Sequence, residues 1–201
     1  MSEIQSPEEA RKRLEIKGII RALGMLPVLI LLAVGFQLLS GKFVSVNNLS
    51  IVVQQASINI VLAAGMTFVI LTGGIDLSVG SILAASAMIA VIVSLIPEYG
   101  MLGIPAAMAI GLAFGLANGC LISFLKLPPF IVTLGSLTAV RGVARLMGGD
   151  TTVFNPELPF DFIGNGTLFG IPWLALIALA VILVSWFILR RTVLGTWIYA
   201  V

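Results

Sequence analysis

The sequence predicts an all-α membrane protein, a polytopic helical bundle with about six transmembrane helices. Of its 201 residues, 59% are hydrophobic and only 10% are charged, whereas about 25% of the residues of a soluble domain are charged. So few charges do not cover the surface of a water-soluble protein of this size, and the uncharged residues form long runs. These observations exclude a soluble enzyme, a disordered tail and a disulfide-rich secreted domain.

Charged residues divide the chain into apolar stretches, each of which holds one helix of about 20 residues, the length that crosses a bilayer. The fifth stretch is less clear because Arg141 and Arg145 fall inside it. It follows Pro128 and Pro129, which suit the first turn of a new helix. It either spans the membrane with snorkelling arginines or forms a re-entrant segment. The predicted spans are residues 23–40, 51–72, 79–96, 101–125, 130–147 and 168–189.

Basic residues outside the spans predict a cytoplasmic N-terminus. With that orientation, the basic N-terminal segment 1–22 and the Arg190-Arg191 pair lie in the cytoplasm or at its membrane surface. Residues 23–201 then form the transmembrane domain, with the acidic loop 149–166 outside. A net charge of only +2 gives no reason to expect a nucleic-acid partner, so the lipid bilayer is the surface expected to contact this chain.

Small residues on the fourth span predict close helix packing. Gly111, Gly115 and Gly119 recur every four residues, and such a stripe lets two helix backbones approach each other in lipid. Alanine, glycine and serine also line the second and third spans, so we expect spans two to four to form a packed inner bundle. The first and last spans, rich in leucine, isoleucine and valine, are expected at its periphery.

Uncharged polar side chains on these spans are candidates for a solute pathway. Gln55 and Asn59 share one face of the second span, and Asn118 lies within the glycine stripe. A polar residue inside a membrane is unfavourable and commonly marks a pathway or a partner. Hydrogen bonding between helices is the alternative for each residue alone. Together, the three indicate a protein that passes something polar.

The turn between the second and third spans carries another candidate. Gly73 and Gly74 allow a sharp turn with positive φ, and Asp76 or Ser78 is placed to cap the next helix. Capping alone accounts for Asp76, and the functional alternative places it at a hinge or gate near the cytoplasmic mouth of a pathway. Arg141 on the fifth span either snorkels to the outer interface, holds a neighbouring helix or faces the pathway.

Other classes of function are weakly supported by the residues. No histidine is present and Cys120 is the only cysteine, so zinc, haem and histidine-based acid–base sites lack their usual groups, and no metal or cofactor is expected. An intramembrane enzyme would depend on Asp76 alone, which is a poor catalytic set. The alternative to a transport subunit is a stand-alone channel or an ion-coupled carrier for a small polar solute.

Five short motifs follow one another between residues 72 and 200. They are T-G-G-I-D-L-S-V-G-S at 72–81, N-G at 118–119, K-L-P-P-F-I-V-T-L-G at 126–135, R-G at 141–142 and R-R-T-x-L-G, then I-Y-A, at 190–200. This set resembles the membrane permease subunits of ABC importers for monosaccharides of the ribose, galactose and xylose type. The glycine–aspartate motif combined with the proline–proline–phenylalanine motif is quite specific.

The resemblance implies a permease subunit of an ATP-driven importer in the bacterial inner membrane, with a monosaccharide such as ribose as its substrate. It implies three protein partners: an ABC ATPase subunit, a second permease subunit (as a homodimer or with a related chain) and a periplasmic or extracellular sugar-binding protein. ATP hydrolysis then belongs to the ATPase. This chain is not expected to be an enzyme, and it contains no G-x-x-x-x-G-K-[ST] phosphate loop.

Members of the resembled family extend further than this chain, through more helices and a cytoplasmic loop that docks on the ATPase. The resemblance therefore implies a C-terminally truncated chain, the N-terminal part of a longer family domain. Reconstituted alone with its ATPase, such a chain is expected to show no sugar-stimulated ATP turnover. The sugar stays open, because ribose, xylose, galactose, inositol and other polyols all fit.

Overall fold

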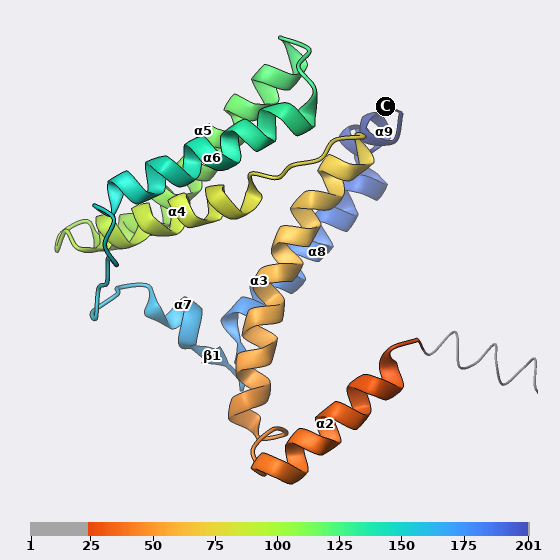
Figure 1. Ribbon diagram of the computed structural model, residues 1–201, viewed down its shortest axis with the longest axis vertical. Helices are drawn as coiled ribbons and strands as arrows, with labels where there is room; N and C mark the ends of the chain where they lie inside the picture. The colour runs from red at the N-terminus through yellow and green to blue at the C-terminus, as the bar shows by residue number, and fades with distance from the viewer. Residues whose placement is uncertain (1–23, 201) are drawn as a thin grey trace, which may run out of the picture. The chain divides into compact units, whose positions relative to one another are not determined.

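The fold is all-α, as the sequence predicts. The computed structural model describes residues 24–200, so the predicted N-terminal segment 1–22 lies outside the described residues. Figure 1 shows the elements in chain order. The helices are α2 (Leu26–Ser40), α3 (Val46–Leu71), α4 (Val79–Ser94), η1 (Gly100–Leu102), α5 (Gly103–Ser123), α6 (Pro129–Met147), α7 (Asp161–Asn165), α8 (Trp173–Arg191) and α9 (Val193–Ala200), and the strands are β1 (Thr167–Leu168) and β2 (Ile171–Pro172).

Each of the six predicted spans contains a helix. Four helical segments are long and apolar enough to cross a membrane: α3, η1 with α5, α6 and α8. The other two, α2 and α4, are shorter apolar helices of 15 and 16 residues. Because α6 is one unbroken helix of 19 residues, its length supports a full span over a re-entrant segment. The cytoplasmic orientation of the N-terminus stays a prediction.

Two predicted helix starts are displaced by five residues in the structure, each for a local reason. The helix α3 begins at Val46 instead of residue 51, since the Asn48 backbone N–H donates to Ser45 Oγ at 3.3 Å and caps an earlier first turn. The helix α8 begins at Trp173 instead of residue 168. The intervening residues pair instead as a two-stranded antiparallel hairpin.

The chain divides into two compact units, residues 1–51 and residues 52–201. In the first unit, the turn after α2 is held by local bonds. The backbone N–H of Val44 donates to Gln37 Oε1 at 2.8 Å, and the rings of Phe36 and Phe43 stack with centroids 5.8 Å apart.

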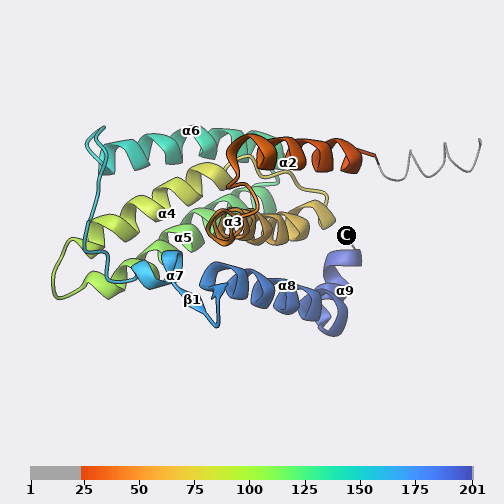
Figure 2. The same ribbon diagram turned by 90° about the horizontal axis from the view of Figure 1, so that it is seen from below.

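In the second unit, α4, α5 and α6 pack against one another, and we call them the packed group. Figures 1 and 2 show the three helices side by side. Ala85 of α4 is buried against Val140 and Ala144 of α6, with Ile110 and Phe114 of α5 beside them. The expected bundle of spans two to four is therefore wrong by one helix. Among the described residues, α3 makes no comparable contact with another helix, and α6 takes its place.

The loop between α6 and α8 packs onto the end of the packed group. Asn155 Nδ2 donates to both the carbonyl and the hydroxyl oxygen of Ser94, each at 2.9 Å. Gly103 leaves room for the Phe160 ring, because an added Cβ would lie 2.8 Å from Phe160 Cε1. These contacts fix the loop that leads into α7 and the hairpin.

Candidate functional site

The site begins where the helical path is interrupted between α3 and α4. Gly73 adopts φ +72°, a left-handed conformation that suits glycine, so this part of the glycine expectation is confirmed. Gly74 has an ordinary φ but a crowded position, since an added Cβ would lie 3.2 Å from both Val69 Cγ1 and its carbonyl oxygen. The chain then runs without helix as far as the start of α4 at Val79.

Asp76 holds the turn that leads into α4. Its Oδ1 accepts hydrogen bonds from the Ser78 backbone N–H at 2.8 Å and from Ser78 Oγ at 2.6 Å. Ser78 is the N-cap residue, is fully buried and makes no side-chain cap bond to the helix. The carboxylate therefore orders the residue that precedes the helix and does not cap the first-turn N–H groups, which corrects the simple capping expectation for both residues.

A chain of hydrogen bonds links this turn to both other helices of the packed group. Asn118 Nδ2 on α5 donates to Ser78 Oγ at 3.0 Å. Ser136 Oγ on α6 donates in turn to Asn118 Oδ1. We call Asp76, Ser78, Asn118 and Ser136 the polar chain. Asn118 is 5% exposed, and a buried polar network of this kind stabilises a structure only when its groups have partners. Among the described residues, no buried side-chain nitrogen or oxygen lacks one.

Two further hydroxyl groups bind the same elements together. Thr133 Oγ1 on α6 donates to the Ile75 carbonyl at 3.1 Å and lies 2.9 Å from the Pro129 carbonyl within its own helix. Ser81 Oγ on α4 donates to the Leu137 carbonyl of α6 at 2.9 Å. These bonds place the turn inside the packed group. At about 1.5 Å per residue, Thr133 lies about 6 Å along α6 from its first residue. The Ile75 carbonyl, which accepts from Thr133, therefore lies beside the first turn of α6 and not beyond its end.

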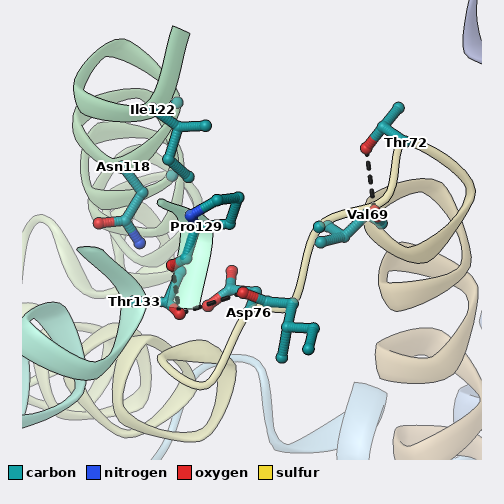
Figure 3. A pocket seen from close by; sticks show the side chains of 11 residues that line it. Val69, Thr72, Asp76, Asn118, Ile122, Pro129 and Thr133 are labelled. Atoms are coloured by element: carbon teal, nitrogen blue, oxygen red, sulfur yellow. Dashed lines mark hydrogen bonds between the residues drawn. The ribbon is translucent and has the colours of Figure 1, made fainter. Parts of the chain in front are cut away.

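Asp76 and Asn118 line a common cavity of about 340 Å³. Figure 3 shows both residues with Thr72, Thr133 and Pro129 around it. Its wall combines a carboxylate, an amide and two hydroxyl groups with apolar surface. The lining residues are Val69, Thr72, Gly74, Ile75, Asp76, Gly115, Asn118, Gly119, Ile122, Pro129 and Thr133.

The three stripe glycines have different surroundings. A Cβ added at Gly111 would lie 3.4 Å from Ser86 Oγ and 3.9 Å from Ile82 Cγ2, so Gly111 lies at the contact between α5 and α4. Gly115 and Gly119 would meet no described atom within 4 Å, and they line the cavity instead. Within the described chain, Gly111 thus lies at a helix contact, whereas Gly115 and Gly119 lie at the cavity wall.

The remaining candidates from the sequence lie elsewhere. Gln55 and Asn59 are exposed on α3 and do not line the cavity. Arg141 is exposed beside a separate opening of about 520 Å³ near the other end of α6. There Arg145 Nε lies 2.7 Å from Asp150 Oδ1, and both side chains are largely exposed, at 72% and 65%. The structure thus brings together Asp76 and Asn118 alone among the five predicted pathway residues.

Three members of the site were not predicted from the sequence: Ser78 as a link between helices, Thr133 and Ser136. The spacing of Thr133 and Ser136, three residues apart on one helix face, is a signal that could have identified the last two. No group of three or more histidine, cysteine, aspartate or glutamate side chains gathers within residues 24–200, so the described residues offer no cluster for a metal ion.

This chain is similar to membrane permease components of known transport systems. A model of the family described as branched-chain amino acid transport system / permease component matches residues 48–201. The ribose import permease protein of Escherichia coli K12 is 36% identical over 181 residues, covering 88% of this chain and 56% of that protein. The corresponding protein of Bacillus subtilis 168 is 37% identical over 199 residues, covering 95% of this chain and 60% of that protein.

A protein named for another sugar has a similar sequence identity to this chain. The D-allose transport system permease protein of E. coli K12 is 35% identical over 161 residues, covering 79% of this chain and 49% of that protein. The chain thus spans about half the length of the curated relatives it matches. No solved structure gives a significant match.

Proposed function

The chain belongs to the branched-chain amino acid transport system / permease component family, and from that premise we propose that it forms part of the membrane pathway of an ATP-driven monosaccharide importer. It is a multi-pass helical protein of the bacterial inner membrane, and its relatives are transport components and not enzymes. The family favours an importer subunit over the ion-coupled carrier that the sequence left as an alternative.

The observation that carries the proposal is the cavity beside the turn between α3 and α4. Non-helical backbone at membrane depth is stable only where protein buries it or where it lines a cavity. The turn from Thr72 to Ser78 meets this condition through its bonds to Thr133 and Asn118 and through the cavity it lines.

The side chains on the cavity wall suit the hydroxyl groups of a sugar. A hydroxyl group both donates and accepts, and a carboxylate accepts through two oxygens. The hydrogen bonds that Asp76 receives from described residues all go to Oδ1. Its Oδ2 is therefore a free acceptor within the described part of the chain, next to the apolar surface that Ile75 and Ile122 provide. We propose that Asp76 contacts the passing sugar and that Asn118 holds the turn in position.

The proposed partners follow from the family. They are an ABC ATPase subunit, a second permease subunit in a homodimeric pathway and a sugar-binding protein that delivers the substrate. Relatives of this chain are named for the transport of ribose, D-allose, fructose and galactofuranose. We therefore propose a monosaccharide of this class, with ribose first.

The test uses the Asp76→Asn variant in the transporter that contains this chain, with its ATPase and binding protein. Asparagine keeps an oxygen that accepts from Ser78, so the turn is expected to form while the charge is lost. We expect uptake of radiolabelled ribose to fall on the order of tenfold, the effect of losing one charged hydrogen bond of about 1.5 kcal/mol.

Two controls separate a pathway role from a structural one. Asp76→Ala removes both bonds to Ser78 and should lower the thermal stability of the detergent-solubilised complex, whereas Asp76→Asn keeps an acceptor for Ser78 and should lower it less. Asn59→Asp places a new carboxylate on α3 away from the cavity and should affect uptake less than a change at the turn. Full uptake by Asp76→Asn would contradict the proposed contact, and uptake of none of the four sugars would contradict the solute class.

A further inference from the structure

The hairpin between α7 and α8 carries an exposed apolar tip. Its register pairs Thr167 with Pro172 and Leu168 with Ile171, which leaves Phe169 and Gly170 as the two turn residues. The Phe169 side chain is 96% exposed, and Leu168 and Ile171 beside it are 37% and 48% exposed. No described part of the chain covers this tip.

The backbone at the tip favours a different residue from the one present. Phe169 and Gly170 have φ values of +52° and +81°, the pattern of a two-residue hairpin turn in which both central residues have positive φ. Asparagine, aspartate and glycine are the usual first residues of such a turn, and a bulky side chain with positive φ is strained. A phenylalanine at this position therefore strains the backbone. Its side chain makes no contact within the described chain that would offset the strain.

The hairpin is joined by a backbone hydrogen bond to the start of α8, a helix long and apolar enough to cross a membrane. The Trp173 backbone N–H donates to the Gly166 carbonyl at 3.1 Å, which closes the base of the hairpin onto the first residue of α8. On the other side, Asn165 Nδ2 donates to Asp161 Oδ1 at 2.6 Å within α7. Figure 2 shows the hairpin at the end of α8. Since α8 is apolar enough to cross a membrane, the tip lies within a few residues of the membrane–water boundary.

The charge pattern matches lipid as the surface that covers the tip. From Phe162 to Leu189 the chain carries no charged residue, so the uncharged stretch runs without a break from α7 through the hairpin into α8. Tryptophan is enriched at membrane interfaces, and Trp173 stands at the junction. Aromatic and aliphatic side chains without nearby cations bind a bilayer by apolar insertion instead of by attraction to headgroups.

We propose that the tip Leu168-Phe169-Gly170-Ile171 is a lipid anchor, which inserts its apolar side chains into the bilayer interface and fixes the position of α8. The anchor is independent of the solute that the protein carries. It accounts for Phe169 at a position where the turn alone would favour asparagine.

A spin label at position 168 tests this proposal in the full chain. Cys120→Ala removes the only cysteine, Leu168→Cys carries the nitroxide, and the protein is placed in phosphatidylcholine–phosphatidylglycerol nanodiscs. We expect the label to collide severalfold more often with oxygen, which concentrates in lipid, than with a water-soluble nickel chelate. The ratio should be insensitive to salt, because insertion involves no charge.

The matched variant adds Phe169→Asn in the same labelled background. Asparagine suits the positive φ, so the hairpin is expected to form and the circular dichroism spectrum to be unchanged, while the label shifts severalfold towards nickel accessibility. Labels at Glu157, exposed on the loop between α6 and α7, and at Leu183, exposed on α8, give the aqueous and lipid reference values.

Three results would overturn the anchor. The first is an aqueous value at position 168 with Phe169 present. The second is an identical value with and without Phe169, which would mean that the label and not the phenylalanine enters the lipid. The third is strong dipolar broadening between labels on two copies, which would assign the tip to a protein interface.

Discussion

The helices α6 and α8 have the same length of 19 residues, and both are apolar enough to cross a membrane. They differ in how many of their residues are buried against the rest of the described chain. Four residues of α6 are buried: Val132, Thr133, Val140 and Ala144. Ala178 is the single buried residue of α8. The more apolar of the two helices, α8, is thus the less buried within the described chain.

Polar and small side chains, more than apolar area, select which helices pack together in a membrane. Lipid tails are as apolar as leucine, so burying leucine against protein gains little, and hydroxyl groups, amides and small residues decide which helices associate. The helix α6 offers Thr133 and Ser136 and receives Ser81 from α4. The helix α3 has polar side chains as well, but Gln55 and Asn59 are exposed within the described chain.

The largest expected effect is at a glycine of the packed group. A Cβ at Gly103 would lie 2.6 Å from the Ala90 carbonyl oxygen, so Gly103→Ala should force α4 and α5 apart. We expect a loss of about 3 kcal/mol in the free energy of unfolding, at the upper end for overpacking. Thermal unfolding in detergent, followed by circular dichroism, measures it.

The control for Gly103 is Gly65 in the middle of α3, where an added Cβ would meet nothing within 4 Å. Gly65→Ala should stabilise the protein by up to about 1 kcal/mol, because alanine favours helix over glycine. Equal destabilisation by the two changes would show that α3 is packed as closely as α5. It would contradict the contrast between the packed group and α3.

The next effect is at the centre of the polar chain. Asn118→Leu removes the bonds to Ser78 and Ser136 and should destabilise the protein by about 2 kcal/mol, since each bond between membrane helices contributes about 0.6–1.7 kcal/mol. Chemical unfolding in mixed micelles checks the value. The matched change, Asn59→Leu on α3, should leave the isolated chain within about 0.5 kcal/mol of the wild type.

A smaller effect separates two serines that are equally buried, at 3% exposure each. Ser81 donates to the Leu137 carbonyl of α6, whereas Ser57 donates to the Val53 carbonyl of its own helix at 2.7 Å. Ser81→Ala should destabilise by about 1 kcal/mol because it removes a bond between helices. Ser57→Ala should be close to neutral, since alanine is a better helix former. The reverse order in thermal unfolding would refute the role given to bonds between helices.

The smallest effect is expected at the exposed end of α6. Asp150→Asn breaks the pair with Arg145, but because both side chains are largely exposed, the loss should be below about 0.5 kcal/mol and should vanish in high salt. Unfolding at low and high ionic strength measures it. A loss that persists in salt would mean that the charged end of α6, and not its buried face alone, holds the packed group.

Part of the site could be predicted from the sequence. The turn at Gly73 and the places of Asp76 in that turn and of Asn118 on the packed face of α5 all follow from residue type and spacing. Gln55, Asn59 and Arg141 had equal standing in the sequence, and the structure places none of them at the cavity. The reason is that one-dimensional spacing gives the face of a helix but not the neighbour that the face meets.

The helical class, the order of the apolar segments and the turn between α3 and α4 follow from the sequence alone, because they depend on charge spacing, proline and glycine along a continuous chain. Only the tertiary structure decided that α6 and not α3 completes the packed group, and that two of the three stripe glycines line a cavity. In lipid these choices depend on a few hydroxyl and amide groups, whose bonds form only once three helices lie side by side.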